Sequence, residues 1–325
     1  MDTLRPVDEL VDALHGTLEV LDESAWCARR GRHEARVDAL VAPHLARRAA
    51  GRTHPVEDFL FTYYSHSPAA LRRWHPGFGV ALENASDYAG LKGYADAIHR
   101  AVELVETTLV TVSREYLASQ VPLTAGLREL LTATAQRPAQ LGCFGMHEWA
   151  MVFGLEQAEV RHSSWPLRLG AQATDGVVRS HRIACSHYDA FRFFTSAARP
   201  LNEISPRRDD RPAFEQPGCL HAGMDLYKHA YRLSPLVCSD LVADCFELAR
   251  DIRALDMRAS PYDLSSLGYQ AVRIETSEGK AEYVAAQREF AARAAPLRGR
   301  LIDECDRLLD AADPPLASTD DEIAG

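Results

Sequence analysis

Apolar residues recur three and four positions apart over most of the chain, and this spacing predicts amphipathic helices that each bury one face. The polar positions between them are expected to face solvent. The pattern therefore predicts an all-α fold, a multi-helix bundle. Outside the central part of the chain, the predicted helices cover residues 7–23, 29–50, 94–119, 123–135 and 278–310.

The central stretch, residues 215–255, has the clearest helical pattern. Pro217 and Gly218 end a loop, and helical spacing follows on both sides of a break at Ser234 and Pro235. The second of these helices carries a heptad-like apolar row, which is typical of a bundle core. This row consists of Leu241, Cys245, Leu248, Ile252 and Leu255.

Other segments depart from the helical pattern. Residues 160–215 are rich in β-branched and aromatic residues between candidate turns, which predicts an irregular stretch or a short β excursion. Within it, the proline-containing and charged residues 199–217 could act as a lid. The acidic residues 313–325 are expected to form a disordered tail after a single helical domain, residues 1–312.

Composition narrows the class of protein. The chain has 325 residues, of which 46% are hydrophobic and 25% are charged, and its formal net charge is -10. An acidic protein lacks the positive surface that displaces counterions from a nucleic acid. The charge balance therefore argues against a non-specific nucleic-acid partner.

The sequence also indicates a compartment. Because it has no apolar run long enough to span a bilayer and no signal-peptide core, we expect no membrane partner and a cytoplasmic location. The seven cysteines are scattered without a C-x-x-C pair, which indicates reduced thiols instead of disulfides or a thiolate zinc site. No feature of the sequence indicates an oligomeric state.

Three polar side chains of the first central helix, His221, Asp225 and His229, stand four residues apart. Each is turned only ~40° from the last, so the three line one face. Neutral imidazole and carboxylate at this spacing form a ligand set for iron, manganese or zinc. A solvated stripe has the same spacing, but this polar row borders an apolar row, where a charge needs a partner such as a metal.

Residues 53–58 have the composition of a helix start and carry two further candidates, His54 and Glu57. These two residues are three positions apart and can share a face, which makes Glu57 a candidate ligand. Capping of the helix dipole is the alternative role of this carboxylate. His66 can reach a common site only if the helix unwinds before Pro68.

The apolar segment of residues 142–154 holds His147 and Glu148 side by side. Adjacent residues point ~100° apart on a helix, so only one of them is expected to face a given site. Because a charged Glu148 among apolar neighbours is hard to bury without a cation, we favour Glu148 as the ligand. The histidines that could complete the site are His66, His75, His147 and His187.

The order of these candidates, Glu57, Glu148 and then the group at positions 221, 225 and 229, resembles that of the heme-oxygenase-like dimetal oxidases and oxygenases. The resemblance implies a heme-oxygenase-like helical bundle that holds two Fe(II) ions, or manganese, and activates dioxygen. It further implies a small substrate such as an amino acid or a fatty acid, often in natural-product pathways such as antibiotic biosynthesis.

Sequence blocks over most of the chain carry a second resemblance. They include HPVEDFLF at residues 54–61, GCFGMHEWAMV at residues 142–152 and EQPGCLHAGMDLYK at residues 215–228. These blocks are similar to a group of actinobacterial proteins labelled 3-methyladenine DNA glycosylase. The label implies removal of alkylated bases from DNA, with Asp225 or Asp189 as the catalytic carboxylate.

The leading hypothesis is a non-haem di-iron oxidase or oxygenase that attacks an unactivated C–H bond of a small, amino-acid-like metabolite. Desaturation, hydroxylation and ring closure are the candidate outcomes, and a DNA-repair glycosylase is the alternative function. Lys228 and Arg192 are candidates for holding a substrate carboxylate through charge-assisted hydrogen bonds. The predicted metal ligands are His54, Glu57, His66, Glu148, His221, Asp225 and His229.

Overall fold

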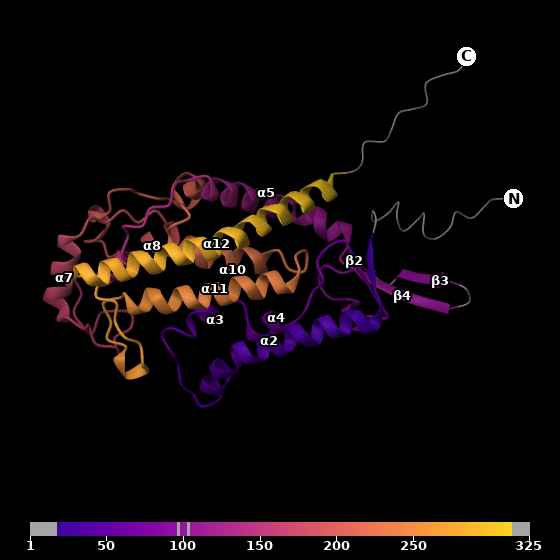
Figure 1. The fold of residues 1–325 in the computed structure, drawn as a ribbon, viewed down its shortest axis with the longest axis horizontal. Coiled ribbons are helices and arrows are strands. Elements are labelled where there is room, and N and C mark those ends of the chain that lie inside the picture. The colour runs from indigo at the N-terminus through magenta and orange to yellow at the C-terminus, as the bar shows by residue number, and fades with distance from the viewer. Residues whose placement is uncertain (1–17, 96–97, 103–104, 314–325) are drawn as a thin grey trace, which may run out of the picture.

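The computed structural model describes residues 18–95, 98–102 and 105–313 of the chain. Helices form most of it and a small sheet lies at one end, so the prediction of an all-α bundle with a short β excursion is confirmed (Figure 1). The longer helices are α2 (Glu23–Ala49), α5 (Arg114–Ala135), α7 (Gly170–Ser180), α10 (Leu220–Arg232), α11 (Ser239–Arg258) and α12 (Ser277–Ala312). The shorter helices are α3 (Phe59–Tyr63), α4 (Pro68–Arg72), α6 (Met146–Ala150), α8 (Tyr188–Phe191) and α9 (Arg211–Phe214).

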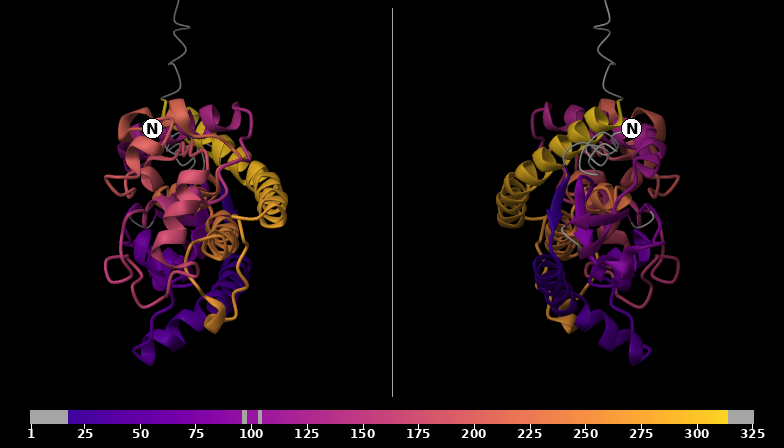
Figure 2. Two further views of the ribbon diagram at one scale, coloured as in Figure 1. Left: turned by 90° about the vertical axis from the view of Figure 1, so that its left-hand side faces the viewer. Right: turned by 90° about the vertical axis from the view of Figure 1, so that its right-hand side faces the viewer.

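Four helices form the centre of the bundle. Helix α10 packs against α11 and α12, and α12 also packs along α5 (Figure 1). The end-on views place α12 and α2 at different edges of the molecule, with α11 between them (Figure 2). The helices predicted over residues 29–50 and 278–310 are confirmed as α2 and α12.

Helix α10 is buried on almost every side, because both α11 and α12 pack on it. Ten of its 13 residues are buried. Gly223 allows the close approach of α11, since a Cβ atom at this position would lie 2.8 Å from Cδ1 of Ile252. The polar residues of α10 therefore lie inside the bundle, where they must find partners within the protein.

The sheet has four strands in the order β1-β2-β4-β3. Strand β1 runs parallel to β2, and the other neighbours are antiparallel. The strands are β1 (Glu19–Leu21), β2 (Val80–Glu83), β3 (Ile98–Val102) and β4 (Val105–Thr111).

Strands β3 and β4 show that the helix predicted over residues 94–119 is wrong in its first part, since α5 begins only at Arg114. Residues 105–112 are rich in valine and threonine, which pack well on a pleated surface, and pairing with β2 outweighs their apolar spacing. The side chain of Ser113 caps α5 by accepting a hydrogen bond from the backbone of Tyr116 at 3.0 Å.

Predictions for three other segments differ from the structure or lie outside the described residues. Residues 160–215 hold three helices, α7, α8 and α9, with only isolated bridges where a β excursion was predicted, so the sheet comes from an earlier part of the chain. The helix predicted over residues 7–23 lies mostly outside the described residues, and Glu19–Leu21 is a strand. The predicted tail also lies outside them beyond residue 313. No helix in the described part of the chain is long and apolar enough to cross a membrane.

Candidate metal centre

Three buried side chains from three helices meet in the bundle. They are His147 of α6, His221 of α10 and Asp256 of α11, and one ligand atom of each lies within 4.8 Å of the others. Nε2 of His147 lies 2.8 Å from Oδ1 of Asp256. The ring centroids of the two histidines are 4.4 Å apart, and the rings are nearly perpendicular.

Local structure explains why these residues meet. Gly145 has φ +66°, a left-handed conformation that suits glycine, and it turns the chain into α6. Trp149 then anchors α6 to the end of α11, because its indole N–H donates to the carbonyl of Ala259 at 2.8 Å. This anchor sets His147 beside Asp256, which lies in the last turn of α11.

The contact between His147 and Asp256 has the features of two ligands of one metal ion. Although Nε2 and Oδ1 are close, neither atom makes a hydrogen bond within the described residues, so their relative direction prevents one. A buried polar atom left without a partner costs roughly 1–3 kcal/mol. A metal ion would satisfy both atoms, since the lone pairs of its ligands point at the ion and not at each other.

The electrostatic environment favours the metal-binding protonation state at His221 and Asp256, whereas a metal would have to displace a proton from His147. Burial lowers the pKa of His221 well below its usual range, and the neighbouring His147 lowers it further, so this ring is neutral. Burial alone would raise the pKa of Asp256, but His147 and Arg253 outweigh it and lower this pKa, so the carboxylate is ionised. Burial also opposes charge on His147, but Asp256 outweighs it and raises the pKa of His147.

Arg253 holds the carboxylate from behind. Its Nη1 donates to Oδ2 of Asp256 at 2.9 Å and to Oε1 of Glu148 at 2.8 Å. Oδ1 of Asp256 makes no hydrogen bond within the described residues and can therefore bind a metal ion. Two carboxylates share one guanidinium, so this buried group keeps one negative charge, which is balanced by a proton on His147 or by a metal ion that replaces this proton.

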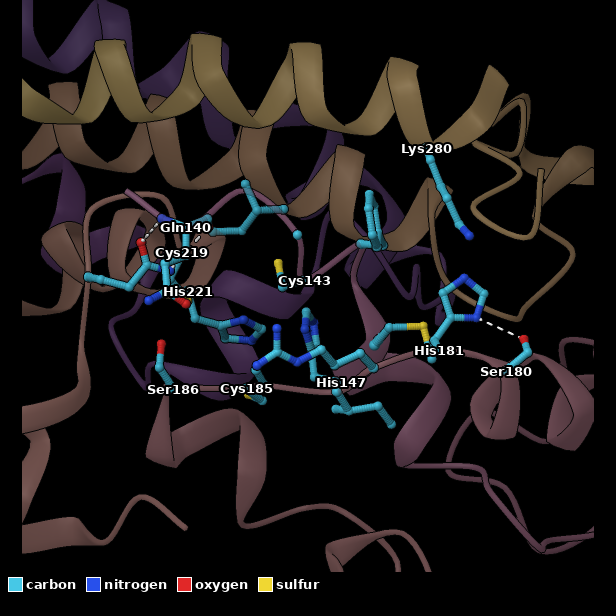
Figure 3. A pocket seen from close by; sticks show the side chains of 18 residues that line it. Gln140, Cys143, His147, Ser180, His181, Cys185, Ser186, Cys219, His221 and Lys280 are labelled. Atoms are coloured by element: carbon cyan, nitrogen blue, oxygen red, sulfur yellow. Dashed lines mark hydrogen bonds between the residues drawn. The ribbon is translucent and has the colours of Figure 1, made fainter. Parts of the chain in front are cut away.

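A cavity of about 390 Å³ reaches the two histidines. His147 and His221 line it, whereas Asp256 lies behind them, so a metal held by the three residues would have its open side toward the cavity. Figure 3 shows the thiol of Cys143 close to both imidazoles, and Lys280 reaching down from α12 at the other end. Cys185 and Cys219 also line the cavity.

A second buried group lies next to the centre. The ring of His187 is 5.3 Å from that of His221, and its Nε2 lies 3.4 Å from Oδ2 of Asp225 and 3.5 Å from Oε1 of Glu215. Arg211 donates to both carboxylates. Asp225 also accepts a hydrogen bond from the hydroxyl of Tyr64 at 3.0 Å, and Lys228 lies 3.6 Å from it.

Of the ligands predicted on α10, the structure brings only His221 into the centre. Residues eight positions apart on a helix are separated by ~12 Å along its axis, which is too far for one metal ion. Asp225 therefore joins the group around His187. His229 is buried farther along the helix, its Nδ1 has no partner among the described residues, and burial lowers the pKa of this ring to about 3.

The preference for Glu148 over His147 is not supported by the geometry. Both residues are buried, and they face different partners, as expected for neighbours on a helix. His147 faces Asp256, while the cation that Glu148 needs is the guanidinium of Arg253. The argument that a buried carboxylate requires a cation holds, but an arginine provides it.

Glu57 and His54 lie away from the centre. The Glu57 carboxylate pairs with Arg47 at 2.5 Å, and more than a third of its side chain is exposed. Nδ1 of His54 accepts hydrogen bonds from the backbone N–H groups of Val56 and Glu57, so this histidine stabilises the turn before α3. The structure thus gives both residues local roles.

His66 and His75 also lie outside the centre. The ring of His66 stacks on that of Tyr231 with centroids 4.4 Å apart, and burial lowers the pKa of His66 to about 4. His75 makes a 2.9 Å hydrogen bond with the hydroxyl of Tyr94. Of the open candidates for the last ligand, His147 is therefore in the cluster and His187 is beside it.

Lys228 and Arg192, predicted to hold substrate, line a different cavity, and both contact the carboxylate of Asp189. The cations that line the cavity of the two histidines are Lys280 and Arg182, and Arg182 is paired with Glu203. Asp256 was missed as a ligand, although a signal was present. It stands four residues after Ile252 in the apolar row of α11, where a carboxylate is buried and needs a partner.

Comparison with known proteins adds no assignment. No protein-family model, curated protein or solved structure matches the chain. The resemblances to dimetal oxidases and to the glycosylase-labelled group therefore stay predictions, and the functional argument depends on the residues of the centre.

Proposed function

We propose that the protein is a non-haem iron enzyme, an oxidase or oxygenase that acts on a small metabolite and holds one Fe(II) ion with His147, His221 and Asp256. The observation that carries this proposal is the buried group of two imidazoles and one carboxylate at the end of a cavity. Two histidines and one carboxylate with open positions are the ligand set of non-haem Fe(II) oxygenases. Bound iron would supply the activation of dioxygen.

The chain's own residues would prepare the centre. Arg253 fixes one oxygen of Asp256, so the other oxygen is presented in a set orientation. His147 and, to a smaller extent, Arg253 lower the pKa of Asp256 and keep this carboxylate ionised. Burial keeps His221 neutral. The surrounding helices exclude water, and a cytoplasmic location, as predicted from the sequence, would keep the iron and the cavity thiols reduced.

The cavity supports a small organic carboxylate as the substrate. Its volume of about 390 Å³ suits a molecule of amino-acid or short fatty-acid size. The ammonium group of Lys280 lies 5.7 Å from the ring centroid of Phe144, and no ion pair of this lysine is found within the described residues. Lys280 is therefore available to bind a carboxylate at one end of the cavity, with the C–H bond to be oxidised toward the histidines.

The alternative glycosylase function has weaker support. It requires a carboxylate that faces the substrate, for which the sequence offers Asp225 or Asp189. Asp225 is buried and bonded to Tyr64 and Arg211, and Asp189 is paired with Lys228. Both carboxylates are thus already neutralised by protein groups, and we place the oxidase first.

Metal content after anaerobic reconstitution tests the proposal. We expect about one iron per chain and dioxygen uptake when small carboxylates are supplied as a substrate library. His147→Ala and His221→Ala should each lose the metal. His229→Ala is the matched control, because His229 is also buried on α10 but lies outside the centre. Equal metal content in the wild type and the His221→Ala variant, or no metal in either, would contradict the proposal.

A further inference from the structure

A second, larger cavity shares no lining residue with the thiol-lined one. It has a volume of about 980 Å³, is open to solvent, and is lined by the end of α2, the following loop, α3 and residues 161–165. None of its lining residues belongs to the metal centre. Any role of this cavity is therefore separate from the proposed iron site.

The cavity is lined by an excess of positive charge. Arg48, Arg52, Arg161 and Arg192 line it, and of these only Arg192 makes an ion pair within the described part of the chain. Arg48, Arg52 and Arg161 are exposed, so a ligand can reach their guanidinium groups from solvent. Guanidinium groups are suited to binding phosphate, because their N–H donors match its oxygen atoms.

The single acidic residue that lines the cavity does not offset these arginines. Asp58 is already bonded to Nη2 of Arg47 at 2.7 Å, to Nδ1 of His44 at 2.8 Å and to the backbone N–H of His54 at 2.7 Å. The Asp58 carboxylate is therefore already paired with donors in the cavity wall and does not pair with the arginines that line the cavity. An anion that enters the cavity would meet the three unpaired guanidinium groups.

Aromatic side chains complete the cavity. Phe59 and Tyr63 are stacked with centroids 5.0 Å apart, and both line the cavity together with Phe61 and Trp165. Flat apolar rings beside guanidinium groups suit a ligand that has a planar ring at one end and a phosphate at the other. Hydroxyl groups that can donate to such a ligand are found at Thr53, Ser163 and Ser164.

From this arrangement we infer that the cavity is a binding site for a phosphorylated small molecule with a planar ring, of the nucleotide class. The phosphate contacts Arg48, Arg52 and Arg161, and the ring packs on the aromatic side chains near Trp165. This site does not depend on the iron centre, so either proposal can fail without the other.

Calorimetric titration of the full-length protein with nucleoside 5′-monophosphates, the matching nucleosides and inorganic phosphate tests the inference. We expect the monophosphates to bind, and both the nucleosides and inorganic phosphate to bind at least about tenfold more weakly. Arg52→Ala and Arg161→Ala should each weaken the monophosphate about tenfold. Trp165 lines the cavity, so its fluorescence gives a second measurement of binding.

Arg48→Ala and Arg32→Ala form a matched pair. Both arginines are exposed on α2 and make no ion pair among the described residues, but only Arg48 lines the cavity. We expect Arg48→Ala to weaken the monophosphate and Arg32→Ala to leave it unchanged. The inference is overturned if the monophosphates do not bind, if phosphate alone binds equally well, if only an oligonucleotide binds, or if the two variants behave alike.

Discussion

Two buried groups of histidines and carboxylates lie side by side in this bundle, and they differ in how their charge is balanced. Around His147 and His221, the two carboxylates Asp256 and Glu148 share the single guanidinium of Arg253. Around His187, three carboxylates meet three cationic side chains. These are Glu215, Asp225 and Asp189 with Arg211, Lys228 and Arg192.

This difference in charge balance indicates which of the two groups would bind a metal. A buried charge is costly unless it is paired, so the group with a remaining negative charge has a use for a cation and the neutral group has none. This argument favours one metal ion per chain, where the ligand order in the sequence suggested two. It also shows that histidine and carboxylate content alone does not distinguish a metal site from an ion-pair network.

The largest expected effect is on stability. Arg211→Met leaves Asp225 and Glu215 buried without their guanidinium, and we expect the free energy of unfolding to fall by about 3–5 kcal/mol. Urea unfolding measures it. The loss should be the same with and without added metal, because this group does not bind one.

Arg253→Met is the matching change at the other group and should cost a similar amount in metal-free protein. Metal at a hundredfold excess over the dissociation constant should stabilise each chain with an intact centre by about 2.7 kcal/mol. At one fixed metal concentration the Arg253→Met loss relative to the wild type should become smaller, because this variant buries two carboxylates without a guanidinium and gains more from a cation. If the loss relative to the wild type is the same with and without metal for Arg253→Met, as it should be for Arg211→Met, the contrast between the two groups is wrong.

The second prediction concerns metal affinity. Asp256→Asn removes the charged ligand from the centre, and we expect metal to bind at least about 100-fold more weakly, beyond the usual effect of an outer contact. Asp225→Asn changes the neighbouring group and should leave the affinity within about threefold. Competition with a chelator measures both. If Asp225→Asn loses more metal affinity than Asp256→Asn, the metal site lies at the group around His187 instead.

The third prediction uses His66, a half-buried imidazole that has no carboxylate partner among the described residues. Burial lowers its folded pKa to about 4, whereas an unfolded chain titrates near 6.5. Between these values the unfolded state binds more protons, so stability is lost as the pH falls from about 6.5 to about 4. His66→Phe keeps the stacking on Tyr231 and should reduce this loss by about 1–2 kcal/mol. If the free energy of unfolding depends on pH in the same way in the wild type and in the His66→Phe variant over this range, His66 is not the group responsible for the loss.

The smallest expected effect provides a baseline. Arg36 bridges Asp244 and Glu247 at 2.8 Å each, and all three side chains are about a third exposed. Asp244 also pairs with Arg300 at 2.7 Å. Because solvent screens these charges, Arg36→Ala should cost only about 0.5–1 kcal/mol in urea unfolding. A loss as large as that of Arg211→Met would show that burial is not what separates the groups.

The sequence by itself determined the helical class, the long helices and the burial of a polar row on α10. The 3.6-residue period of apolar positions is a local property, so it can be recognised without the fold. The same period misled over residues 98–111, because strand pairing with a distant segment overrode it. The helical spacing within α10 identified His221 as a candidate ligand, because the spacing within this one helix already places the residue beside a buried face.

Only the tertiary structure decided which side chains meet His221. Asp256 and His147 come from helices far apart in the chain, and the anchor of Trp149 on Ala259 brings them together. The partners of Glu148, Asp225 and Glu57 are arginines on other segments, and no local pattern identifies them. Whether a buried carboxylate binds a metal or an arginine depends on what packs against it, which is a property of the fold.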